Sequence, residues 1–260
     1  PFGSAADFHA GVVQGQDGDF RRVWRATKTE IAALRRDFLT DGVIDGEVPF
    51  DMLTWPGKGN VHNRYNIDFT TIKTDPNLQA APFEDVNADG VYNVFDGDYP
   101  RIKGDQMAWW SINDDSTHFN STGVPLKIDL AISAYVYDCA QNETVKNTLF
   151  VDFEFINRSA NTYDSTYLGF FTDFELGCYT DDYIGSIPAT NSYYSYNQDA
   201  IDTNCDGGVQ GFGENIPVQS VTFQNKELSH FIYYNNLGVG TPVQAQTDPT
   251  TAVENYNYLQ

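Results

Sequence analysis

The sequence predicts a mainly β protein, an antiparallel β-sandwich with one N-terminal helix. Several short segments alternate apolar and polar residues, the pattern of half-buried strands, and clusters of Asn, Asp, Gly and Pro separate them. Aromatic residues make up 15% of the 260 residues. Disordered chains are poor in aromatic residues, so this chain should fold.

The helix is predicted near the start of the chain. Thr27 and Glu30 have the spacing of a capping box, and Ile31, Leu34 and Phe38 follow at helical intervals. Basic residues concentrate around this segment: Arg21, Arg22, Arg25, Lys28, Arg35 and Arg36. We expect them to pair with acids of the same molecule or to mark a contact with an acidic neighbour.

The remaining elements are predicted to be strands and an irregular wrap. The expected strands are residues 126–137, 149–156, 167–174, 218–223 and 229–234. The stretch 46–100 carries five prolines and many glycines, which favour an ordered but irregular wrap. We therefore expect a single β-rich domain over 1–260, in three parts: a helix and irregular wrap (1–79), a calcium-loop segment (80–105) and a β-sandwich (106–260).

The composition of the chain argues against nucleic-acid binding and against a transmembrane helix. The 36 Asp and Glu residues outnumber 15 Lys and Arg residues, which gives a formal net charge of −21. So acidic a chain does not hold a nucleic-acid backbone. No stretch approaches the roughly 20 apolar residues of a transmembrane helix.

The most specific motif is a calcium-type loop of twelve residues, from Asp85 to Asp96. Oxygen-bearing side chains occupy loop positions 1, 3, 5, 9 and 12, and Gly90 takes position 6, where a sharp turn is needed. The predicted Ca²⁺ ligands are Asp85, Asn87, Asp89, Val91 through its carbonyl, Asn93 and Asp96. Prolines flank the loop, so paired EF-hand helices are not expected and the loop should act as a fixed staple. An Asn/Asp/Gly turn without metal is the alternative.

Two weaker acidic clusters follow. Asp173, Glu175, Asp181 and Asp182 crowd a short stretch and form a possible second metal site, because such carboxylates repel one another unless solvent or a cation relieves them. Asp202, Asn204 and Asp206 repeat only the first half of the loop pattern. They are a possible weak metal site, and a solvated turn is the alternative.

The sequence carries no recognisable catalytic motif, so we expect no enzyme. Asp152 and Glu154 share one strand face, which could suit glycoside hydrolysis but more often is a solvated face. Trp109 and Trp110 are possible ligand-binding residues that could stack on sugar rings, or could lie in the core. The three cysteines, Cys139, Cys178 and Cys205, allow one disulfide and a free thiol, or three buried thiols.

Several motifs together resemble a known family. They run in order along the chain: Leu53–Asn60, Ala81–Tyr92, Gly97–Gln106, Trp110–Asp114, Ile156–Ser159, Asp173–Gly177, Asp181–Gly185 and Tyr196–Asn197. The series is similar to large secreted or cell-surface proteins of Bacteroidota that are exported by the type IX secretion system. The resemblance spans roughly residues 20 to 260, and its most specific block is 80–106. After Gly185 the family often has Cys, and this chain has Ser186.

The resemblance implies an extracellular or cell-surface location. Family members usually carry a cleaved N-terminal signal and a C-terminal sorting domain, so we expect this chain to be part of a longer protein. From these lines together we expect a calcium-stabilised structural or adhesive protein, such as a component of a surface fibre, layer or adhesin. Its expected partners are other copies of itself, other surface proteins or glycans. The alternative is a carbohydrate-binding module, or part of a secreted polysaccharide-degrading enzyme.

Overall fold

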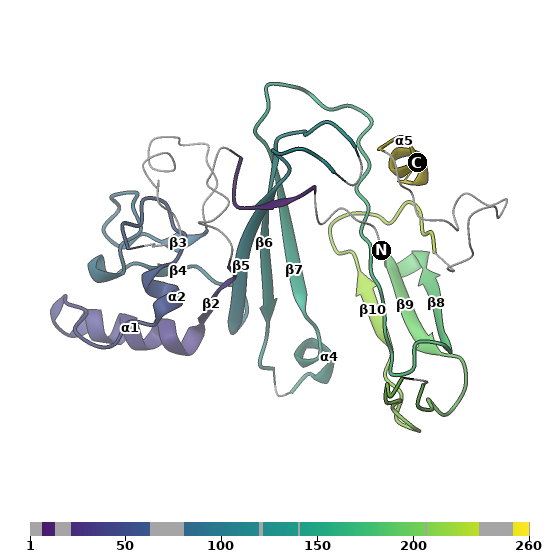
Figure 1. Cartoon of the computed structure of the whole chain (residues 1–260). Coiled ribbons are helices and arrows are strands. Elements are labelled where there is room, and N and C mark those ends of the chain that lie inside the picture. Colours follow the sequence, from purple (N-terminus) through teal and green to yellow (C-terminus); the bar gives the residue numbers. More distant parts are fainter. Residues whose placement is uncertain are drawn as a thin grey trace. The chain divides into compact units, whose positions relative to one another are not determined.

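The computed structural model describes residues 7–13, 22–62, 81–119, 122–139, 141–205, 207–233 and 252–259. Within them the chain is mainly β, with antiparallel sheets and few helices, as the sequence predicts. It divides into two compact units (Figure 1). One comprises the described residues within 3–162, and the other comprises those within 163–260.

The predicted N-terminal helix is confirmed as α1 (Lys28–Asp41). The Thr27 hydroxyl accepts from the Glu30 backbone N–H at 3.2 Å, and the Glu30 carboxylate accepts from the Thr27 backbone N–H at 2.9 Å. Both bonds of the capping box are therefore present. The helix ends at Gly42, whose φ of 82° is the left-handed conformation that glycine adopts without strain.

The larger sheet belongs to the unit 3–162. Its strands are β1 (His9–Ala10), β2 (Trp24–Thr27), β5 (Gln106–Asn113), β6 (Ile128–Val136) and β7 (Phe150–Asn157). All pairs are antiparallel in the order β1-β5-β6-β7, and β2 also pairs with β5. β6 and β7 confirm two of the predicted strands.

The core of this unit contains several large aromatic side chains. Trp24 and Trp109 are 0% and 2% exposed, and their ring centroids lie 6.1 Å apart. Trp55 donates from Nε1 to the Pro82 carbonyl at 3.1 Å, and the Tyr92 hydroxyl donates to the Met52 carbonyl at 2.6 Å. These bonds satisfy the polar ends of buried rings. Tyr92 and Met52 thereby join the stretch 81–100 to the segment that follows α1.

Short elements make up the rest of this unit. They are α2 (Phe50–Leu53), β3 (Phe83–Glu84), the 3₁₀ turn η3 (Val94–Asp96), β4 (Tyr99–Pro100) and α4 (Glu143–Lys146). The predicted irregular wrap agrees with the described parts of 46–100, which hold only such short elements. Residues 63–80 of the wrap lie outside the described residues.

The unit 163–260 contains a three-stranded antiparallel sheet in the order β10-β9-β8. Its elements are β8 (Asp182–Ile187), the 3₁₀ turn η4 (Pro188–Thr190), β9 (Ser192–Asn197), β10 (Gln219–Thr222) and α5 (Ala252–Leu259). β10 confirms the strand predicted over 218–223. Tyr193 of β9 is 6% exposed, and rings of Phe174, Phe223 and Phe231 surround it.

Two predicted strands of this unit are wrong. Residues 167–174 form no strand: their aromatic rings pack individually, Phe170 on Phe223 and Phe174 on Tyr193, while the backbone joins no ladder. Residues 229–233 also form no strand, and Tyr234 lies outside the described residues. Apolar composition alone mimicked a strand in both places.

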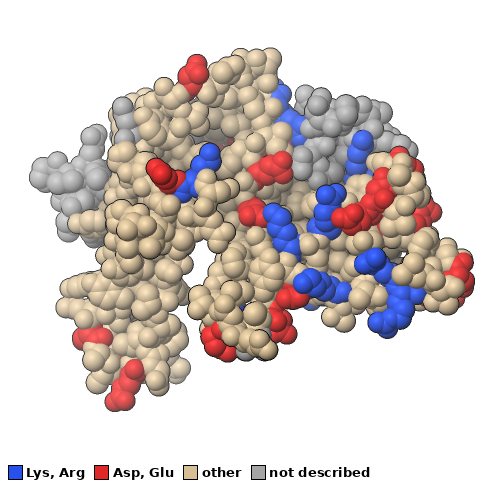
Figure 2. Space-filling view, turned by 180° about the vertical axis from the view of Figure 1, so that it is seen from behind, with Lys and Arg blue, Asp and Glu red and all other residues tan. Residues whose placement is uncertain are grey.

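Three of the basic residues around α1 pair with acids, which is one of the two expected outcomes. Arg22 contacts Asp51, Arg25 lies 3.1 Å from Glu30, and Lys28 lies 2.8 Å from Asp105. Figure 2 shows Lys and Arg side chains gathered on one side of the view, interleaved with Asp and Glu. Arg21 lies outside the described residues.

Among the helices that the structure describes, none is long and apolar enough to cross a membrane.

Candidate metal centre

The predicted calcium loop lies between β3 and β4. These strands pair Phe83 with Pro100 and Glu84 with Tyr99, so both ends of the loop start from one short ladder. Tyr92, within the loop, is fully buried against the core. The ladder and Tyr92 fix the loop on the unit 3–162.

The first half of the loop folds around its own carboxylates. Asp85 accepts from the backbone N–H of Gly90 at 2.7 Å and of Asp89 at 3.2 Å. Asp89 in turn accepts from the Val91 N–H at 2.8 Å, and the Asn87 amide donates to Asp89 at 3.1 Å. Gly90 has a φ of 79°, the left-handed conformation expected at loop position 6. The three side chains at positions 1, 3 and 5 therefore lie together inside one turn.

The second half brings the remaining two predicted side chains into contact. The Asn93 amide donates to the Asp96 carboxylate at 2.8 Å, and its oxygen accepts from the Phe95 N–H at 3.2 Å. Asn93 caps η3, which contains Asp96. The side chains at positions 9 and 12 are thus neighbours.

Asp98 is a functional candidate that the sequence reasoning missed. It is 1% exposed, and its two oxygens accept from the Val86 N–H at 2.8 Å and the Asn93 N–H at 2.9 Å. The carboxylate therefore clamps both halves of the loop. Burial, more than any other effect, raises the pKa of Asp98, and the charges of Asp85 and Asp89 raise it further. Asp98 lies after the last position of the twelve-residue pattern, so the pattern does not include it. Its place directly after Gly97 is the one sequence signal that could have identified it.

The donor set of the loop suits calcium. It consists of hard oxygen atoms from carboxylates, amides and the Val91 carbonyl, which Ca²⁺ prefers over zinc or copper ligands. Within the residues that the structure describes, no three His, Cys, Asp or Glu side chains are grouped closely enough to hold a metal ion. Calcium binding would therefore draw the carboxylates together and would rely on the amide and carbonyl oxygens.

The second predicted cluster lies in the unit 163–260, and its four side chains differ in their exposure to solvent. Asp173 and Glu175 are exposed, whereas Asp181 and Asp182 are half-buried. One oxygen of Asp182 accepts from the Leu176 N–H at 2.8 Å. Burial raises the pKa of Asp182 most, and the charges of Asp181, Asp202 and Glu175 raise it further.

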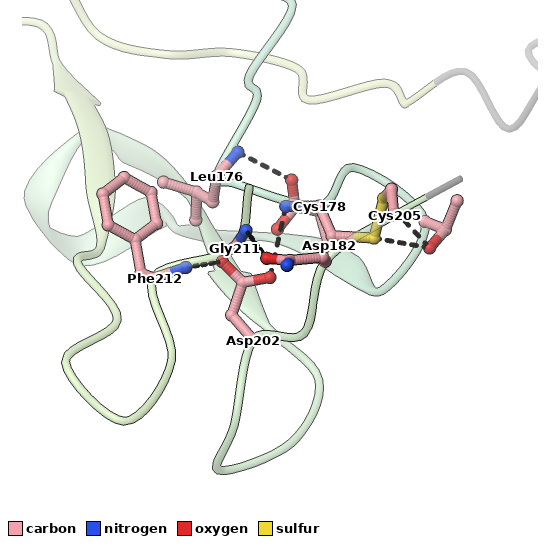
Figure 3. The surroundings of a disulfide bond; sticks show 9 residues. Leu176, Cys178, Asp182, Asp202, Cys205, Gly211 and Phe212 are labelled. Atoms are coloured by element: carbon pink, nitrogen blue, oxygen red, sulfur yellow. Dashed lines mark hydrogen bonds between the residues drawn. A yellow bond between two sulfur atoms is a disulfide. The ribbon is translucent and has the colours of Figure 1, made fainter. Parts of the chain in front are cut away.

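The third predicted cluster surrounds a disulfide. Asp202 is 2% exposed, and its oxygens accept from the Cys178 N–H at 3.2 Å and the Phe212 N–H at 2.7 Å (Figure 3). Asn204 accepts from the Gly211 N–H at 3.0 Å, and Asp206 lies outside the described residues. Cys178 and Cys205 form the disulfide, and Cys139 is free. Asp202 and Asn204 thus bind backbone amides and hold this loop closed.

The predicted ligand-binding tryptophans lie on opposite faces of β5. Trp109 is in the core, where a sugar ring cannot reach it, and Trp110 is half-buried on the other face.

Asp152, one of the two carboxylates on a shared face of β7, is paired with Lys103 at 2.5 Å. Both side chains of this ion pair are exposed, which agrees with the alternative of a solvated strand face.

Comparison with known proteins adds no further assignment: no family model, no curated protein and no solved structure matches the chain. The resemblance to exported surface proteins of Bacteroidota therefore stays a prediction from the motifs.

Proposed function

We propose that this chain is a calcium-stabilised, β-rich extracellular protein with a structural or adhesive role at the cell surface. The observation that carries the proposal is the loop 85–98. Its oxygen ligands follow the calcium pattern, and its buried Asp98 lies close enough to Asp85 and Asp89 for their charges to raise its pKa. A bound Ca²⁺ would offset this repulsion and fasten the loop to the core through Tyr92.

The disulfide supports the extracellular part of the proposal. Disulfides persist in oxidising compartments and are rare in the cytosol, and Cys178 and Cys205 form one here. Export by the type IX secretion system, suggested by the motifs, is consistent with it. The proposal assigns no catalytic activity.

The surface of the larger sheet supports the structural or adhesive part. Val151, Phe153 and Phe155 alternate along β7 and are 37%, 40% and 51% exposed. β7 stands at the end of the strand order, and an edge strand with apolar side chains favours association with other proteins. Other copies of the chain or other surface proteins are the proposed partners, and the antiparallel β-sandwich predicted from the sequence belongs to the same proposal.

The carbohydrate-binding alternative is weakened because Trp109, one of its two candidate residues, is buried. A sugar-stacking site needs an exposed aromatic face, and Trp109 is 2% exposed. The half-buried Trp110 alone does not favour this function over the structural one.

Limited digestion with chymotrypsin tests the calcium part, because cleavage after the fully buried Tyr92 requires the loop to open. We expect the wild-type chain to resist cleavage there in CaCl₂ and to be cut in EGTA. Asp89→Asn should be cut even in CaCl₂, since it lacks a loop carboxylate. Asp164→Asn removes an exposed charge from the other unit and should behave like the wild type.

Equal resistance of the wild-type chain in CaCl₂ and in EGTA would refute the calcium part. Labelling of intact cells with an antibody against the chain tests the location. Surface labelling is the expected result, and recovery of the protein only from lysed cells would count against an extracellular role.

A further inference from the structure

A groove of about 420 Å³ lies in the unit 3–162, between the start of α1, the start of β5 and the end of β6. Ligand-binding sites in proteins usually have volumes of about 300–1,000 Å³. The polar and aromatic side chains that line this groove are Thr29, Asp105, Gln106, Tyr137, Asp138 and Lys146. All of them lie outside the loop 85–98, so the groove is separate from the candidate metal centre.

Asp105 connects the three elements that surround the groove. Its carbonyl accepts from the Lys28 N–H at 2.9 Å, and its own N–H donates to the Val136 carbonyl at 2.8 Å. Its carboxylate accepts from Lys28 Nζ and from the Asp138 N–H, both at 2.8 Å. These bonds hold α1, β5 and β6 together around the groove. A site that is preorganised in this way loses less free energy to ordering when it binds a ligand.

Tyr137, directly after β6, supplies an aromatic wall. It is 37% exposed, and its ring stands nearly perpendicular to the rings of Phe150 and Tyr135, with centroids 5.5 and 6.0 Å away. Tyr135 and Phe150 stack on each other at 5.4 Å. The Tyr137 ring is therefore held by two other rings and still reaches solvent. The negative face of such a ring attracts the C–H groups on the apolar face of a sugar ring.

Three polar side chains of the groove have unused hydrogen-bonding capacity. The Thr29 hydroxyl, the Gln106 amide and the Asp138 carboxylate are exposed and bind no other group within the described residues. The hydroxyl and the amide both donate and accept, whereas the carboxylate accepts. Sugar hydroxyls also donate and accept, so a single saccharide can satisfy all three side chains.

The charges around the groove favour a neutral ligand. Lys28 is bonded to Asp105. Lys146 lies 4.0 Å from Glu143. An anionic ligand would meet these acids and Asp138, and a cationic ligand would meet both lysines. An uncharged ligand avoids either repulsion.

We propose that this groove binds a neutral saccharide. One pyranose ring stacks on Tyr137, and its hydroxyls bind Thr29, Gln106 and Asp138. The groove contains neither of the tryptophans that the sequence suggested for sugar stacking. The proposal goes beyond the calcium staple and the protein partners, because it gives the chain a glycan partner through residues that neither of them uses.

An array of neutral and charged glycans, probed with the labelled 260-residue chain in CaCl₂, finds the saccharide, and calorimetric titration then measures its affinity. We expect the wild-type chain to bind at least one neutral glycan. Tyr137→Ala should weaken that binding roughly tenfold or more, because it removes the stacking ring. Tyr179→Ala removes a tyrosine of the other unit that is 59% exposed, and it should change the affinity by less than about twofold.

Two variants at exposed positions leave the packing of Tyr137 intact. Thr29→Trp places a bulky side chain in the groove and should abolish binding. Gln106→Ala removes a hydrogen-bonding group and should weaken binding roughly fivefold. Circular dichroism should show the wild-type fold in both. The proposal is overturned if the wild-type chain binds no glycan or only charged ones, or if Tyr137→Ala and Thr29→Trp bind the neutral glycan as the wild type does.

Discussion

Replacing Asp129 by alanine should lower the free energy of unfolding of the unit 3–162 by about 3–5 kcal/mol, because it removes one half of a buried ion pair and the acceptor of a buried backbone N–H. Asp129 is 0% exposed and lies in β6. Its carboxylate accepts from the Val13 N–H at 2.5 Å and from Arg158 Nε at 2.7 Å. The Asp129 side chain thus links Val13, and Arg158 directly after β7, to β6, an inner strand of the sheet.

Urea unfolding followed by tryptophan fluorescence measures this effect in the right unit, because all four tryptophans, Trp24, Trp55, Trp109 and Trp110, lie within residues 3–162. Asp138→Ala is the matched control: Asp138 is exposed, and its loss should change the free energy by less than about 0.5 kcal/mol. Asp129→Asn keeps the shape and should fall between the two. A loss below 1 kcal/mol for Asp129→Ala would contradict the assigned role.

Removing the disulfide should be nearly as costly for the unit 163–260. Cys178 and Cys205 are 27 residues apart, and a cross-link that closes a loop of this size stabilises by about 3–4 kcal/mol in the chain-entropy account. Asp202 lies within the closed loop and accepts from the Cys178 N–H. Cys178→Ser with Cys205→Ser should therefore loosen the Asp202 contacts as well.

Hydrogen exchange read by mass spectrometry locates this loss, since the unit contains no tryptophan. Peptides spanning 176–213 should exchange at least a hundredfold faster in the double variant than in the wild type. Cys139→Ser, which removes the free thiol, should leave these peptides unchanged. Unaltered protection in the double variant would mean that the disulfide does not stabilise this loop.

Local signals in the sequence were enough to predict the helix α1 and part of the larger sheet. The Thr27–Glu30 capping box needs only four consecutive residues, and the alternation in β6 and β7 is visible within each strand. β5 escaped prediction because apolar residues occupy both of its faces: Met107 and Trp109 on one, Trp110 and Ile112 on the other. Such a strand has no visible period of two.

The acidic residues show why the site could be predicted only in part. A spacing pattern found the loop 85–96, but it cannot tell a metal ligand from a carboxylate that binds backbone amides. Asp129 meets Val13 across 116 residues, and Asp202 meets Cys178 across 24. These partners come together only in the folded chain. Part of the formal charge of −21 therefore stabilises the backbone directly, and calcium is proposed to act on the carboxylates of the loop 85–96.

Calorimetric titration of CaCl₂ into the calcium-depleted chain tests the central proposal most directly. The wild-type chain should give a saturable heat, and Asp85→Asn with Asp89→Asn should lose one bound ion per chain. A variant with the wild-type stoichiometry, or a wild-type chain that binds no calcium, would contradict a calcium staple at residues 85–98.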